Sequence, residues 1–224
     1  MSSPSAHRLP HRVGLTVAAL AVATAAPARA RADRYEASIA GELHAGVARV
    51  GEAGAPTTAS VPALGVAGRL THAWHNRLAW DVQLGAALTQ PATFTDVVTT
   101  VGGRPEMGTV TRRAITTAAQ LGAELRLGAR FIPTVRLGLG PQLRYRTGSD
   151  LGALPDVLPA ATSIDALVSV AVGFDLRIGR RLVIGAALQL DHAQPLGDAP
   201  AHDVIGVTVR VSDFFYPRWW SPSW

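Results

Sequence analysis

The chain has 224 residues, a formal net charge of +5 and no cysteine. The missing cysteines exclude a disulfide framework, a cysteine-ligated zinc site and an N-terminal lipoprotein anchor. The first 30 residues carry three arginines and no acid, so 18 Arg remain against 16 Asp and Glu, a net charge of only +2. A balance this close to neutral does not support nucleic-acid binding.

Residues 1–30 have the organisation of a secretory signal peptide. Arg8 and Arg12 form a positive region, VGLTVAALAVATAA is a short apolar run, and residues 28–30 (ARA) form a small-x-small cleavage site. The alternative is an uncleaved membrane anchor. The apolar run of about 14 residues is shorter than the roughly 20 that a spanning helix needs, so we predict removal after Ala30.

Beyond residue 30, apolar and polar residues alternate with the period of two that is typical of strands. Eight runs follow this pattern, over residues 35–47, 63–71, 77–89, 112–127, 131–146, 164–177, 181–191 and 205–212. Tight connections follow the second, fourth and sixth runs, and long connections rich in Gly, Pro, Thr and Asp follow the first, third, fifth and seventh. This alternation predicts an up-and-down meander with short turns at one pole and long loops at the other.

A soluble β-sandwich or ligand-binding barrel would also alternate apolar and polar residues. Two features favour a membrane barrel instead. The runs reach about 10 to 14 residues, whereas soluble strands average roughly five or six. Aromatic residues gather toward the short-turn or terminal pole, as in a girdle at a membrane interface: Tyr35, Trp74, Trp80, Phe131, Phe174, Phe214 and Phe215.

We therefore predict an all-β protein, an eight-stranded antiparallel up-and-down transmembrane β-barrel over residues 31–216. A short periplasmic tail over residues 217–224 follows it. In a bilayer the sheet must close on itself, so its apolar face meets lipid and its polar face turns inward. An arginine on the lipid face at the midplane would cost about 2–4 kcal/mol, which places the strand arginines inside.

The inward charges predict an ion-paired lumen. Because an unpaired buried charge costs several kcal/mol, the near-balance of acids and arginines favours a closed plug, with a narrow pore as the alternative. Toward the long-loop pole the inward set is Arg112, Arg144, Arg146, Asp165 and Asp191. Toward the short-turn pole the predicted lumen ion-pair network is Glu36, Arg69, Asp81, Glu124, Arg126, Arg136, Asp175, Arg177 and Arg210.

The run 131–146 contains a proline that a closed sheet does not easily accept. Pro141 removes a ladder hydrogen bond where a barrel has no free edge. We expect a bulge near Gly140, or a membrane-embedded part that ends there with Arg144 and Arg146 already above the outer interface.

With its signal, eight runs, alternating connection lengths and a final run VIGVTVRV, the chain resembles the small eight-stranded outer-membrane β-barrels. The models are the transmembrane domain of outer-membrane protein A and the opacity and adhesion-type barrels, and the resemblance covers residues 34–216. It implies a Gram-negative outer membrane, periplasmic termini, and outer-membrane lipid and the barrel-assembly machinery as partners. It also implies a structural role, or binding of an extracellular ligand through the long loops. The chain departs from the family pattern because it continues past the last strand.

The sequence has no phosphate loop, nucleophile elbow or HExxH, and we predict no cofactor, no metal and no enzymatic activity. One constellation leaves a surface hydrolase open. Asp191, His192, His202 and Asp203 are expected to face one another across the base of the fourth long loop, as metal ligands or general bases. The alternative is a solvated loop base. A lipid-modifying hydrolase would also need a serine beside His192 on the lipid face, and none is there.

Overall fold

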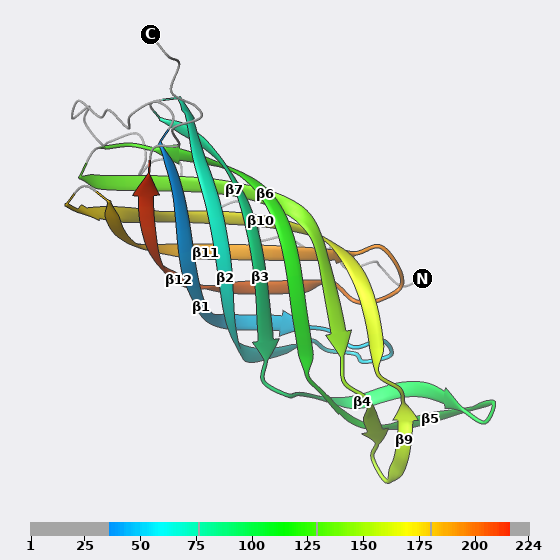
Figure 1. Ribbon diagram of the computed structural model, residues 1–224. Helices are drawn as coiled ribbons and strands as arrows, with labels where there is room; N and C mark the ends of the chain where they lie inside the picture. The colour runs from blue at the N-terminus through cyan, green and yellow to red at the C-terminus, as the bar shows by residue number, and fades with distance from the viewer. Residues whose placement is uncertain (1–35, 76, 129, 180, 216–224) are drawn as a thin grey trace, which may run out of the picture.

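Eight long strands close into one antiparallel barrel (Figure 1). The protein is seen here as a computed structural model that describes residues 36–75, 77–128, 130–179 and 181–215. The predicted signal peptide and C-terminal tail lie outside these residues. The barrel strands are β1 (Ala37–Val50), β2 (Ala59–His75), β3 (Leu78–Thr89), β6 (Ala114–Arg126), β7 (Phe131–Arg146), β10 (Ala161–Ile178), β11 (Leu182–Pro195) and β12 (His202–Phe215). The predicted fold class is confirmed.

Each barrel strand pairs with its neighbours in chain order, and β1 closes the barrel against β12 from Ala37↔Phe215 to Arg49↔Asp203. The strands have 12 to 18 residues and are longer than most of the predicted runs, because pairing continues into the connections. Closure pairs the backbone of both edge strands within the protein. None of the described residues belongs to a helix that is long and apolar enough to cross a membrane.

The two faces of the barrel sheet have opposite character. In β7, Leu137 and Leu139 expose 58% and 63% of their surface, whereas Arg136 exposes 4%. Leucine, valine and isoleucine also point outward from the other barrel strands. The apolar face therefore surrounds the barrel and the polar face lines its lumen, the reverse of a soluble core.

The bulge expected near Gly140 does not form. The pairing of β7 with β10 runs through Gly140 and Pro141 without a shift, and β7 continues to Arg146. On its other side, the pairing of β6 with β7 passes from Ala118↔Gln142 to Leu121↔Leu139 in the same register. The barrel therefore accommodates the missing proline N–H without a bulge. The β6–β7 ladder lacks the pairs between Leu121↔Leu139 and Ala118↔Gln142, while the register of both ladders is kept.

Most of the described aromatic residues assigned to the girdle lie on the outer face. Trp74, Trp80, Phe131 and Phe174 are exposed there, and the rings of Phe131 and Phe174 stack with centroids 5.4 Å apart. Phe214 was wrongly assigned to this girdle, because its side chain is 4% exposed and points into the lumen. Phe214 lies an even number of residues from the inward-facing Arg210 and Ser212 on β12, so its side chain points to the same face. Its position near the strand end had suggested the girdle instead.

Two of the long connections form hairpins of their own, which sequence reasoning had treated as loops. Strands β4 (Ala92–Val101) and β5 (Arg104–Arg112) form one, and β8 (Ser149–Leu151) and β9 (Leu154–Leu158) form the other. Figure 1 shows them beyond the end of the barrel opposite the short turns. The first hairpin turns through a Gly-Gly pair with positive φ at both residues, as a two-residue type I′ turn requires.

The hairpins pack together over an apolar core beyond the polar lumen. Val98 N–H donates to the carbonyl of Gly54 at 3.1 Å, and Gly152 N–H donates to that of Thr109 at 3.0 Å, which ties three connections together. The core comprises Ala48, Val50, Val61, Ala63, Ala92, Phe94, Val97, Val110 and Leu151. We call this assembly the hairpin platform. It gives the long-loop pole a fixed shape.

Candidate functional site: the ion-paired lumen

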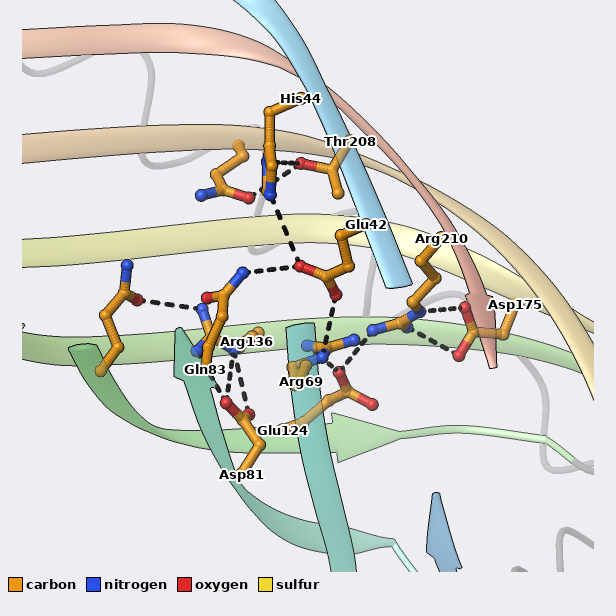
Figure 2. A network of polar contacts seen from close by, with 12 residues as sticks. Glu42, His44, Arg69, Asp81, Gln83, Glu124, Arg136, Asp175, Thr208 and Arg210 are labelled. Atoms are coloured by element: carbon orange, nitrogen blue, oxygen red, sulfur yellow. Dashed lines mark hydrogen bonds and ion pairs between the residues drawn. The ribbon is translucent and has the colours of Figure 1, made fainter. Parts of the chain in front are cut away.

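The predicted network gathers around one carboxylate, Glu124 on β6. Arg126 donates from Nε to Glu124 Oε1 at 2.7 Å. Arg69 and Arg210 each donate from Nη1 to Glu124 Oε2, at 3.0 and 3.1 Å (Figure 2). Glu124 exposes only 1% of its surface. Three guanidinium groups from three strands therefore share one buried anion.

Two further carboxylates balance these arginines. Arg210 also makes a bidentate pair with Asp175, from Nε at 2.8 Å and from Nη2 at 2.6 Å. Arg69 Nε lies 3.0 Å from Glu42 Oε1, and Gln83 donates to Glu42 Oε2 at 2.6 Å. Charge-assisted bonds of this geometry are stronger than bonds between neutral groups, so the cluster joins strands on opposite sides of the lumen.

A separate pair beside this cluster spans β6. Arg136 on β7 donates to Asp81 on β3, from Nη2 at 2.7 Å and from Nε at 3.0 and 3.1 Å. It also donates from Nη1 to Gln120 Oε1 at 3.3 Å. Asp81 is fully buried, and its charge is balanced by Arg136, which the strand alternation predicted to face inward.

The network reaches the short-turn end of the barrel through a third group. Arg177 donates from Nη2 to Glu36 Oε1 at 2.6 Å. The guanidinium of Arg177 lies 4.9 Å from the ring centroid of Phe214, and that of Arg126 lies 5.5 Å from it. Cation–π contacts at these distances explain the inward placement of Phe214.

The long-loop end of the lumen has its own ionic layer. Glu52, from the connection between β1 and β2, lies 3.3 Å from Arg146 and 3.7 Å from Arg112. Arg144 lies 3.0 Å from Asp165 and also donates to the carbonyl of Pro200 at 2.8 Å. Burial lowers the pKa of Arg112 from its ordinary value, an effect that Glu52 opposes. Asp191, predicted for the long-loop set, does not pair with these arginines. It accepts a hydrogen bond from Gln189 Nε2 at 2.9 Å.

A cavity of about 100 Å³ separates the two ionic layers. Gln83, Gln120, Gln142 and Gln189 contribute amide groups to its wall, and small residues line much of the rest. His44 Nδ1 and Thr208 Oγ1 share a 2.8 Å hydrogen bond there. The cavity therefore lies between the ionic groups at the two ends of the lumen.

The hydrolase constellation of the fourth long loop does not come together. His192 and Asp203 face each other on the outer surface, with His192 Nδ1 2.6 Å from Asp203 Oδ1. Asp191 and His202 point into the barrel, because neighbouring residues of a strand point to opposite faces. No group of three or more His, Asp or Glu side chains in the described ranges is arranged to hold a metal ion.

Sequence reasoning missed two acids of the lumen. Glu42 has inward parity on β1 but was left out of the predicted network, although its position opposite Arg210 on β12 could have identified it. Glu52 follows the end of β1 and reaches the lumen from a connection. Strand alternation gives no signal for such a residue.

The fold and lumen define a closed β-barrel with an apolar exterior and an ion-paired interior. Among solved structures, the chain is similar to the attachment invasion locus protein Ail of Yersinia pestis in complex with sucrose octasulfate, at 12% identity and a TM-score of 0.48. That match covers 82% of this chain and 100% of the other.

Two other solved structures match over comparable lengths. The N-terminal β-barrel domain of OprF from Pseudomonas aeruginosa has 15% identity and a TM-score of 0.43, covering 79% of this chain and 97% of that domain. Neisserial surface protein A has 13% identity and a TM-score of 0.44, covering 79% and 96%. No protein-family model and no curated protein matches the sequence.

Proposed function

We propose that the protein is an outer-membrane barrel with a closed lumen, and that it acts by presenting the hairpin platform to a partner outside the cell. The apolar exterior supports the membrane location, because in water the exposed leucine, isoleucine and valine side chains of the barrel strands would form a large aggregation-prone surface. In a bilayer the same face is solvated by lipid, and barrel closure satisfies the backbone. Residues 1–30 direct export in this proposal, and their loss is checked by the intact mass of membrane-extracted protein.

The hairpin platform is the observation that carries the binding role. The two ionic layers support a closed lumen, and a dedicated apolar core holds the long connections in one arrangement. Loops held by a rigid scaffold commonly carry binding function. A structural role in the envelope is the second candidate, and the interlocked lumen favours it.

Purified protein in a planar bilayer tests the closed lumen. We expect no stable conductance steps, since each ionic layer bridges the lumen with pairs at 2.6 to 3.3 Å. Insertion is checked in parallel by the change in gel mobility on heating, which folded barrels show. Stable openings from protein that passes this check would contradict the closed lumen and favour a narrow pore.

Val97→Ala tests whether the platform core fixes the hairpins. Val97 is fully buried in that core, and losing two methyl-sized groups removes roughly 1.6 kcal/mol of burial energy. Because proteolysis follows the population of locally opened chains, we expect about tenfold faster cleavage of the β4–β5 hairpin in vesicle-embedded protein. The matched control is Val98→Ala, at the exposed neighbouring position, which should leave the rate unchanged. Equal rates for the two variants would contradict a folded platform.

A further inference from the structure

The three short turns of the barrel share a feature that the lumen and the platform do not use. Each places an arginine directly before the first residue of the next strand: Arg77 before β3, Arg130 before β7 and Arg181 before β11. The residue that follows is apolar and faces outward in every case, as Leu78, Phe131 and Leu182. An arginine beside a lipid-facing residue therefore recurs around the rim of the short-turn pole.

The backbone fixes these arginines in equivalent positions. The carbonyl of Arg77 accepts a hydrogen bond from Arg126 N–H at 2.8 Å, and that of Arg130 accepts from Arg177 N–H at 2.8 Å. The carbonyl of Arg181 accepts from Phe214 N–H at 2.9 Å. In each case the donor lies on the strand that pairs with the one the arginine precedes. The three residues thus occupy the same level of the barrel at three separate points of its circumference.

Their charges are available to an external partner. All three arginines are exposed, and among the described residues no carboxylate lies within 4.0 Å of the Arg77 or Arg130 guanidinium. Arg181 pairs with Asp213 at 2.7 Å, but this pair is open to solvent, with Arg181 69% exposed. Such an exposed pair is worth about 0–1 kcal/mol, so an anionic ligand can compete for the guanidinium.

Exposed aromatic side chains at the same pole set the depth of this rim. Trp74 and Trp80 lie on either side of the β2–β3 turn that contains Arg77. Phe131, the residue after Arg130, stacks on Phe174. Amphipathic aromatic rings sit at the level of the lipid headgroups, so the arginines lie where headgroup phosphates lie.

We infer that the short-turn rim is a binding surface for anionic phospholipid headgroups, with Arg77, Arg130 and Arg181 as its phosphate-binding residues. The inference rests on the proposed membrane location, with the short turns at the phospholipid leaflet. Each arginine supplies a bidentate donor to a headgroup phosphate, and its apolar neighbour contacts the acyl chain beneath.

Quenching of tryptophan fluorescence by brominated lipids measures the preference. Full-length protein is refolded in mixtures of phosphatidylcholine and phosphatidylglycerol, with the bromine on one lipid or the other. We expect a preference for phosphatidylglycerol of about fivefold per site, given roughly 1 kcal/mol for each basic residue near an anionic surface. The preference should fall as salt screens the headgroup charges.

The decisive variant is Arg77→Gln/Arg130→Gln/Arg181→Gln, in which we expect the preference to fall to about that of a neutral surface. The matched control removes three exposed arginines of the long-loop pole, as Arg49→Gln/Arg104→Gln/Arg113→Gln, and should keep the full preference. The lysine version, Arg77→Lys/Arg130→Lys/Arg181→Lys, should keep much of it, because the charge remains.

Two results would overturn the inference. One is equal quenching by both brominated lipids in the unaltered protein. The other is an unchanged preference in the short-turn glutamine variant. The gel-mobility shift on heating is recorded for the same samples. Failure to insert at all would count against the proposed membrane location, whereas correct insertion without a lipid preference would count against the lipid site alone.

Discussion

Glu124→Gln should destabilise the folded barrel by about 3–5 kcal/mol, the cost expected when a buried ion pair loses one partner. Three arginines donate to this carboxylate, and they are not equally dependent on it. Arg69 keeps Glu42 and Arg210 keeps Asp175, but among the described residues Arg126 has no other carboxylate partner. A neutral glutamine would leave the Arg126 charge buried against the ring of Phe214 alone.

Urea unfolding of the vesicle-inserted protein, followed by tryptophan fluorescence, measures this loss. The control is Asp213→Asn, which breaks the exposed pair with Arg181 and should cost about 0–1 kcal/mol. Adding Arg126→Met to Glu124→Gln removes the orphaned charge and should restore part of the stability. If Glu124→Gln costs no more than Asp213→Asn, the lumen network does not stabilise the barrel.

Leu137→Arg should cost about 2–4 kcal/mol, because it places a charge on the lipid face near the bilayer midplane. Leu137 lies near the middle of β7 and is 58% exposed on the outer face. The same substitution at Tyr145, on the same face but next to the end of the strand, should cost about 0–1 kcal/mol. The unfolding assay described for Glu124 applies to both variants.

The dependence on depth separates a membrane barrel from a soluble one. In water an arginine on either exposed site would be harmless, so equal and small effects at Leu137 and Tyr145 would argue against the bilayer. Large and equal effects at both sites would instead indicate that the hydrocarbon core of the membrane extends beyond Tyr145.

Strand alternation was enough to predict the sidedness of the barrel. Arg136 lies inside and Leu137 outside because a strand has two faces and a bilayer tolerates charge on only one of them. The partner of each charge was not predictable in the same way. Arg136 meets Asp81 over β6, which pairs with both β7 and β3, so the contact depends on two successive strand registers.

The connections were the least predictable part of the fold. Glu52 enters the outer ionic layer from a segment without strand periodicity, and the β4–β5 hairpin is interrupted by a register shift between Phe94 and Val97. The Gly102-Gly103 pair was the available signal for that hairpin, since glycine readily adopts the positive φ of a type I′ turn.

The hairpin platform also has a consequence for the order in which the chain folds. Its core joins Ala48, near the end of β1, with Leu151 of β8, two residues that are far apart in sequence. Contacts of such long sequence separation form late, once the intervening chain is already held together. By the same measure the pairing of β1 with β12, which joins residues as distant as Ala37 and Phe215, forms later still, so we expect the platform core to assemble before the barrel closes.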